Sequence, residues 1–373
     1  MNAERLHAIV KSLRGELSQR NVMGGVEGLI AALRNMTAQP SNAGFQQTVV
    51  NSRETLRKAL SDAPSDSFSP TWRQVLRDIG GEELFGHRLL HSIEDAINQN
   101  QMTPTVALQV IDAIKERLKA FTEALDHANG ALELFRIGSE KLTPGECEIG
   151  ILIPRQAVNN KLPEYIRELG EMEFILDTLC EVATGGVDDL EVRTLSSSDL
   201  MLFLAAHPQV GEIVAKAVDF IVTQYKKILE IRKVQREIER LELPEEISER
   251  TREHANKLMA EKIDTFTVEI MNEYQAVSDT GRRNELRNAV KLSLSGMANR
   301  IDRGFHIEVR IEPPPKDKAT EEVTRAVQTI QAASVNMQFM KLEGPPILGL
   351  PEAAGEKDGA PERPRKRGRS RKE

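Results

Sequence analysis

The sequence predicts a mostly α-helical protein that contains one small α+β unit. Apolar residues recur at helical spacing over most of the chain, but the spacing changes to every second residue at 147–153 and 305–311, as in strands. From Gly344 onward proline, glycine and charged residues dominate, which predicts a tail without fixed structure. We therefore expect four parts: a helical domain at 1–140, an α/β unit at 145–312, a linker with one further helix at 313–343, and a disordered basic tail at 344–373.

The N-terminal part is expected to be a helical domain that ends in one long helix at 103–136. Thr103-Pro104 predicts the start of this helix, because threonine caps a helix and proline suits its first turn. After it, apolar residues recur at alternating steps of four and three, a heptad pattern that requires a partner helix. That partner is either another N-terminal helix or a second copy of the chain. We call these residues the first seam: Ala107, Ile111, Ile114, Leu118, Phe121, Leu125, Ala128, Leu132 and Phe135.

The α/β unit is predicted as a strand, a helix, a second strand, a helical insertion and a final strand. A helix at 163–183 follows the strand at 147–153, and the second strand spans 189–195. The serines and the aspartate at 196–199 are expected to cap a short apolar helix. A helical hairpin at 208–278 and one more helix then precede the last strand. This order favours a ferredoxin-like sheet with helices on one face.

The first helix of this hairpin has a second heptad pattern. We call its residues the second seam: Val210, Val214, Ala217, Ile221, Gln224, Ile228, Ile231, Gln235 and Ile238. Glutamine at two of these positions either fixes the register and the partner, at some cost in stability, or marks where the seam turns to solvent. The sequence leaves both interpretations open.

The composition excludes several classes of protein. Aromatic residues make up only 4% of the 373 residues, too few for a platform on which single-stranded nucleic acid stacks. The net charge is −7, but residues 351–373 carry eight basic and five acidic residues, so residues 1–350 carry −10 and would repel a nucleic-acid duplex. The two cysteines form no C-x-x-C motif, which favours a reducing compartment.

The sequence predicts neither export nor a membrane crossing. Met1–Arg5 already contains charged residues, and no continuous apolar run follows it. A secretory signal is therefore not expected. The most apolar stretch, Leu200–Val222, is interrupted by Glu212, Lys216 and Asp219. Each such charge near the centre of a bilayer would cost about 2.5–3.5 kcal/mol. We therefore expect a cytoplasmic protein without a transmembrane segment.

Few residues are candidates for metal binding or catalysis. His87 and His91 lie one helical turn apart, but the His-Glu-x-x-His arrangement is missing and partly buried histidines explain them as well. Asp177 with Glu191-Val192-Arg193 is similar to the residues that hold Mg²⁺ in nucleases. However, the same tripeptide recurs at Glu308-Val309-Arg310, and such alternation is typical of any half-exposed strand. We predict no catalytic, cofactor-binding or metal site.

The basic tail supplies candidates for phosphate contacts. Such a tail binds nucleic acid or an anionic membrane surface without sequence specificity. It can equally bind the acidic body of the protein or only aid solubility. The candidates are Arg363, Arg365, Lys366, Arg367, Arg369 and Arg371.

Three segments of the α/β region resemble a recurrent module of uncharacterised bacterial proteins. They are Cys147–Arg155, Leu195–Asp199 and Ile228–Lys233. The resemblance covers less than half of the chain and ends before the last strand. It implies a bacterial origin and supplies no catalytic residue.

The sequence has two regular heptad patterns and no recognisable set of catalytic residues. This combination predicts a non-enzymatic interaction or regulatory protein. It would act through the two seams, in a homo-oligomer or a larger complex. Two alternatives are a nucleic-acid-associated protein that uses the basic tail and a peripheral membrane effector that uses the apolar segment 200–222. The expected contact residues of the seams are Ile111, Ile114, Leu118, Phe121, Leu125, Val214, Ile221, Ile228 and Ile231.

Overall fold

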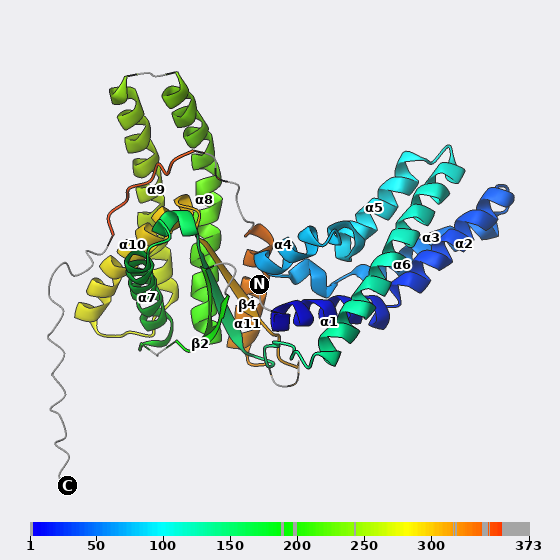
Figure 1. Cartoon of the computed structure of the whole chain (residues 1–373), viewed down its shortest axis with the longest axis horizontal. Helices are drawn as coiled ribbons and strands as arrows, with labels where there is room; N and C mark the ends of the chain where they lie inside the picture. Colours follow the sequence, from blue (N-terminus) through cyan, green and yellow to red (C-terminus); the bar gives the residue numbers. More distant parts are fainter. Residues whose placement is uncertain are drawn as a thin grey trace, which may run out of the picture.

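The computed structural model confirms a mostly helical protein with one small sheet (Figure 1). The described residues contain eleven α-helices and a single four-stranded antiparallel sheet. The disordered tail was predicted to begin at residue 344, but residues 344–352 pack against the α/β unit, with Ile347 and Leu350 buried, so that part of the prediction is wrong; residues 353–373 lie outside the described residues. The described residues are 3–187, 190–196, 200–241, 244–315, 317, 319–337, 342 and 344–352.

The N-terminal region is an array of six helices around its own hydrophobic core. Ser69 caps α4 through its hydroxyl, with Pro70 at the first helical position, and the Asn42 side chain caps α3. The long helix α6 packs against α1, α2 and α5, and Leu13, Leu29 and Leu89 are among the residues buried between them. The helices are α1 (Ala3–Gln19), α2 (Val22–Ala38), α3 (Ala43–Leu60), α4 (Pro70–Asp78), α5 (Gly86–Gln99) and α6 (Pro104–Leu134).

The sheet has the strand order β2-β3-β1-β4, and all neighbouring strands are antiparallel. The central strand β1 pairs with β3 on one side and β4 on the other, so that Gly150 lies opposite both Phe203 and Glu308. β2 and β4 are the edges. The ferredoxin-like assignment itself stays a prediction. The strands are β1 (Cys147–Ile153), β2 (Val192–Ser196), β3 (Leu200–Ala206) and β4 (His306–Ile311).

The short apolar helix expected after residue 199 is wrong, because this segment is strand β3. Leu200–Ala206 pairs with β1 along its whole length, and Met201 and Leu204 are buried on opposite faces of the sheet. A continuous apolar run has no period that separates a buried strand from a buried helix. Pairing with β1 therefore decided the conformation.

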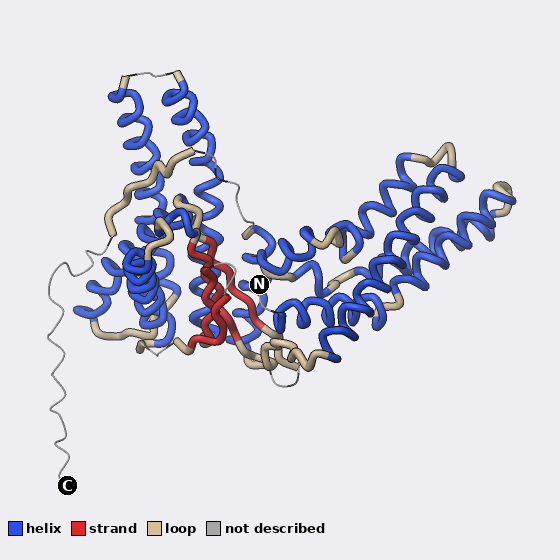
Figure 2. Tube along the Cα trace, in the orientation of Figure 1, coloured by secondary structure: helices blue, strands red, loops and turns tan. Residues whose placement is uncertain are grey.

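Five helices complete the α/β unit, and two of them form the expected hairpin. α8 and α9 project beyond the sheet as a two-helix arm (Figures 1 and 2). The first turn of α8 contacts β1 closely at Gly211, where a Cβ atom would lie 2.2 Å from the Cys147 Sγ. The helices are α7 (Leu162–Thr184), α8 (Pro208–Arg240), α9 (Glu245–Glu273), α10 (Thr280–Asp302) and α11 (Glu321–Asn336).

Helices cover both faces of the sheet, whereas helices on one face were expected. Figure 2 shows the strands between the helices of the α/β unit and those of the N-terminal region. Ile149 and Ile151 point into the core that contains α8 and α10. On the opposite face, Glu148 contacts Arg5 of α1, and Glu308 contacts Thr71 of α4. The N-terminal helices thus form the second layer over the sheet.

Candidate functional site

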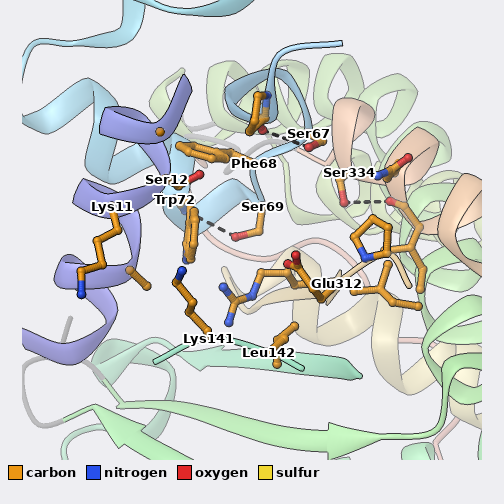
Figure 3. A pocket seen from close by; sticks show the side chains of 18 of the residues that line it. Lys11, Ser12, Ser67, Phe68, Ser69, Trp72, Lys141, Leu142, Glu312 and Ser334 are labelled. Carbon is orange, nitrogen blue, oxygen red and sulfur yellow. Dashed lines mark hydrogen bonds between the residues drawn. The ribbon is translucent and has the colours of Figure 1, made fainter. Parts of the chain in front are cut away.

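A groove of about 540 Å³ opens where the N-terminal helices meet the edge strand β4 (Figure 3). Its walls come from α1, the segment 64–72, the loop at 140–142, the end of β4 and α11. The side chains that line it include Lys11, Ser12, Phe68, Trp72, Lys141 and Glu312. These residues are separated by up to 301 positions in the sequence, so only the fold brings them together.

A buried ion cluster lies under this groove and joins the two parts of the chain. The Arg5 guanidinium donates to both carboxylate oxygens of Glu148, at 2.8 and 3.1 Å, and to Glu140 at 3.1 Å. Arg310 lies 3.3 Å from the same Glu148 carboxylate. Arg5 and Glu148 are 1% and 2% exposed, and Arg5 also lies over the Phe203 ring, 3.4 Å from its centroid. Buried charges require such pairing, so the cluster depends on the closed junction.

Glu308 extends this cluster along the edge strand. One carboxylate oxygen accepts the main-chain N–H of Thr71 at 2.8 Å, and the other lies 3.3 Å from the Ser69 hydroxyl, which donates to it. Burial raises the pKa of Glu308, and the hydrogen bonds from Thr71 oppose that rise. Gly150 makes room for the side chain, because a Cβ there would lie 2.9 Å from the Glu308 Cγ.

Aromatic rings form the wall of the groove nearest the cluster. The Phe68 and Trp72 rings meet edge to face with centroids 4.9 Å apart. Both rings are labelled in Figure 3. The Arg310 guanidinium lies 4.7 Å from the Trp72 ring, a cation–π contact between α4 and β4. The Trp72 indole N–H is buried and has no hydrogen-bond partner among the described residues. These rings therefore hold the N-terminal helices against the sheet.

Glu16, which lines the groove, is engaged in hydrogen bonds with two segments of the N-terminal region. Glu16 accepts hydrogen bonds from the Ser65 main chain and hydroxyl, at 2.9 and 3.0 Å, and from the Gly86 N–H at 3.1 Å. Burial raises its pKa despite these bonds. The carboxylate is thus used to fix the segment after α3. Among the described residues, no group of three or more His, Cys, Asp or Glu side chains is placed so that it could hold a metal ion.

The two candidate histidines lie on the exposed side of α5 and contact different carboxylates. The His87 Nδ1 lies 2.5 Å from Asp66, and the His91 Nδ1 lies 2.9 Å from Asp95. Their side chains are 70% and 75% exposed. Both histidines are therefore exposed neighbours of carboxylates, and the partly buried position expected of them is wrong.

Of the nuclease-like residues, Asp177 lies on α7, Glu191 directly precedes β2 and Arg193 lies on β2. Arg193 pairs with Glu146 at 2.8 Å, next to the start of β1. The second copy of the tripeptide lies on β4, where the expectation of a half-exposed strand is wrong, because Glu308 is buried and Arg310 is largely buried. The serines at 197 and 198 and Asp199 lie outside the described residues. Cys147 is no nucleophile, since burial raises the pKa of its thiol to about 12.

Both seams pack mainly within the chain, although Phe135 at the end of the first seam is 71% exposed. Ile111, Leu118 and Leu125 are buried in the N-terminal core, and Ile114 and Phe121 pack against it. Val214, Ile221 and Ile228 are buried in the core of the α/β unit, and Ile231 packs against that core. Gln235 is buried and hydrogen-bonds to Ser248 of α9 at 2.5 Å, whereas Gln224 is partly exposed. The partner helices of the seams thus belong to the same chain.

The remaining candidates are placed as follows. The apolar segment 200–222 forms β3 and the first half of α8, and its apolar side chains lie mainly in the core. Across the described part of the chain, no helix combines the length and the apolar character that a membrane crossing needs. The phosphate-contact candidates Arg363, Arg365, Lys366, Arg367, Arg369 and Arg371 lie outside the described residues.

No local pattern in the sequence marks the residues that join the two parts of the chain. Arg5 and Glu140 belong to no motif, and Ser69 directly precedes Pro70 at the start of a helix, as many helix caps do. A usable signal existed on the strands, where Glu148, Glu308 and Arg310 alternate with core residues. It predicts a polar face but not that other helices bury this face.

No protein-family model, no curated protein and no solved structure matches the chain.

Proposed function

We propose that the protein is a non-enzymatic interaction protein that self-associates through the distal end of its α8–α9 hairpin. The groove at the junction supports a structural role, because its charged and aromatic residues are used to join the two cores. The apolar residues of the helical seams pack mainly within the chain. A contact with another molecule therefore has to use surfaces that the fold leaves exposed.

The observation that carries the proposal is the apolar surface at the end of the hairpin. Val234, Leu241 and Ile247 are 54%, 60% and 42% exposed. α8 has 33 residues and thus extends about 50 Å, well beyond the sheet. Apolar side chains grouped at the end of a projecting arm are typical of a contact surface.

The charges at the same end favour a second copy of the chain as the partner. The distal half of α8, 226–240, carries six basic and three acidic residues, whereas the start of α9, 245–253, carries four acidic and two basic residues. In a twofold dimer each α8 contacts the α9 of the partner. The opposite charges would then face each other across the contact and favour this pairing.

Light scattering on the purified full-length chain tests the proposal. We expect a concentration-dependent mass of twice 41.7 kDa, and we expect Leu241→Asp to return the mass to one chain. Met102→Asp is the matched control, because Met102 is 94% exposed in the loop between α5 and α6, far from the hairpin in the sequence. A chain that stays monomeric at high concentration, or a dimer that Leu241→Asp leaves intact, would contradict the proposal.

The proposal places the protein in the cytoplasm. Cys147 and Cys180 are free thiols buried in the core of the α/β unit. Free, buried thiols suit a reducing compartment. Non-specific phosphate binding by the tail is a separate contact, and deletion of 361–373 should remove salt-sensitive binding to DNA or to anionic vesicles. Unchanged binding after this deletion would exclude the tail.

A further inference from the structure

The last described segment, Gly344–Glu352, crosses the α/β unit without forming a helix or a strand. In Figure 1 it is the orange-red stretch that passes over α9 before the C-terminal trace begins. We call residues 344–352 the strap. The side chains that bind it come from α8, α9 and α10, and we call them the cradle: Arg232, Asn256, Asn299, Arg300 and Asp302.

The cradle binds the main chain of the strap. One carboxylate oxygen of Asp302, Oδ2, accepts two successive N–H groups, from Ile347 and Leu348, each at 2.7 Å. The Asn299 amide accepts the Leu350 N–H at 3.0 Å and donates to the Leu350 carbonyl at 2.9 Å. Two successive N–H groups converge on one oxygen, so the backbone bends at 347–348, and these contacts with the main chain do not depend on the side chains of the strap.

Three side chains of the strap add selectivity. Ile347 and Leu350 are 3% and 6% exposed and belong to the core of the α/β unit. Glu352 then pairs with Arg300 at 3.0 Å and accepts from the Asn299 amide at 2.6 Å. The cradle thus suits two apolar residues three positions apart, followed after two positions by a carboxylate.

The cradle is a fixed set of buried polar groups. Asp302 is fully buried, and its other oxygen, Oδ1, accepts from Arg232 at 2.9 Å and from the Tyr225 hydroxyl. Arg300 is held from behind by Glu168 at 3.1 Å. Both N–H groups that donate to Asp302 Oδ2 come from the strap, so without the strap this buried oxygen would lose both hydrogen bonds. A buried acceptor without a donor costs free energy unless other donors replace the strap.

We propose that the cradle is a peptide-binding site and that the strap is its intramolecular ligand. Its ligand class is a peptide that has the spacing of Ile347, Leu350 and Glu352 and adopts the backbone conformation of the strap. A ligand on the same chain has a high effective concentration, so a free peptide would compete poorly until the strap is weakened. This inference is independent of self-association through the hairpin.

A competition experiment with the full-length chain tests this site. The probe is a fluorescein-labelled peptide with the sequence of residues 344–352. The double variant Ile347→Asp/Leu350→Asp should bind the probe, and the unsubstituted chain should bind it about 100-fold more weakly. Adding Asn299→Leu to the double variant should abolish binding. A folded double variant that does not bind the probe, or binding that Asn299→Leu leaves unchanged, would overturn the proposal.

Amide hydrogen exchange gives a second test that does not depend on the double variant being folded. In the unsubstituted chain, the amides of Ile347, Leu348 and Leu350 should exchange slowly. Asp302→Asn should speed the first two, and Asn299→Leu should speed the third. Exchange at the rate of an unstructured peptide in the unsubstituted chain would show that the strap is not a ligand of the cradle.

Discussion

The two faces of the sheet are built from the same strands but are stabilised in different ways. One face presents Ile149, Ile151 and Val309 to the helices of the α/β unit, which is ordinary apolar burial. The other presents Glu148, Glu308 and a few neighbours to the N-terminal helices, where each charge needs a specific partner. The apolar face tolerates small changes of shape, whereas the charged face should tolerate very little change in charge.

Removing the central carboxylate of the charged face should have the largest effect. Glu148→Gln would leave Arg5 and Arg310 with less compensation in a buried cluster, and we expect a loss of about 3–5 kcal/mol in the free energy of unfolding. Ile151→Val on the same strand is the matched control for the apolar face, with an expected loss of about 0.5–1.5 kcal/mol. Urea unfolding measures both. Equal losses would remove the distinction between the two faces.

A methyl group added between the charged side chains should have the next largest effect. Gly150→Ala would place a Cβ 2.9 Å from the Glu308 Cγ and 2.9 Å from the Phe203 ring. Neighbours have to shift, and we expect a loss of about 1–3 kcal/mol. Gly28→Ala in α2 is the control, because nothing lies within 4 Å of its Cβ and alanine favours a helix. We expect Gly28→Ala to stabilise the protein; if Gly150→Ala stabilises it as well, the charged face is not close-packed.

The charged face should also respond to pH through His306. Desolvation lowers the pKa of His306 from 6.5 to about 4, so the ring is neutral in the fold and protonated when unfolded between these values. The neutral His306 ring therefore contributes fully to the free energy of unfolding above pH 6.5. This contribution is lost as the pH falls toward 4, by up to about 1.4 kcal/mol per pH unit. His306→Asn removes this part of the pH dependence.

Urea midpoints at pH 7, 5.5 and 4.5 check this prediction. The stability of His306→Asn relative to the unsubstituted chain should increase as the pH falls. Ile151→Val provides the pH-independent reference. A His306→Asn difference that stays constant over this range would show that the ring titrates normally in the fold.

An exposed ion pair should have the smallest effect. Arg14 and Asp126 join α1 to α6 at 2.6 Å, with side chains 38% and 52% exposed. We expect Asp126→Asn to cost no more than about 1 kcal/mol, and less in high salt. The contrast with Glu148→Gln separates the effect of charge from that of burial. A loss as large as that of Glu148→Gln would mean that burial does not determine the cost.

Local patterns predicted much of the fold. The alternation at 147–153 and 305–311 predicted β1 and β4, and Thr103-Pro104 predicted the start of α6. β3 was missed, because a continuous apolar run looks the same in a buried strand and a buried helix. The heptad patterns of both seams are real, but a pattern does not say whether its partner is in the same chain.

The candidate site could not be predicted, because its partners are far apart in the sequence. Arg5 and Glu148 are separated by 143 positions, and Thr71 and Glu308 by 237. A charged residue on a strand is normally solvated, so only the position of the N-terminal helices reveals that Glu308 is buried. The cradle was missed for the same reason, since Asn299 and Asp302 look like ordinary residues of a helix end.

The proposed self-association is tested most directly by a charge exchange at the end of the hairpin, measured by light scattering on the full-length chain. Lys233→Glu/Arg240→Glu should give a single-chain mass, because like charges would then face each other in the dimer. Adding Glu245→Lys/Glu249→Lys to that variant should restore the double mass. A mass that neither pair of substitutions changes would contradict the account.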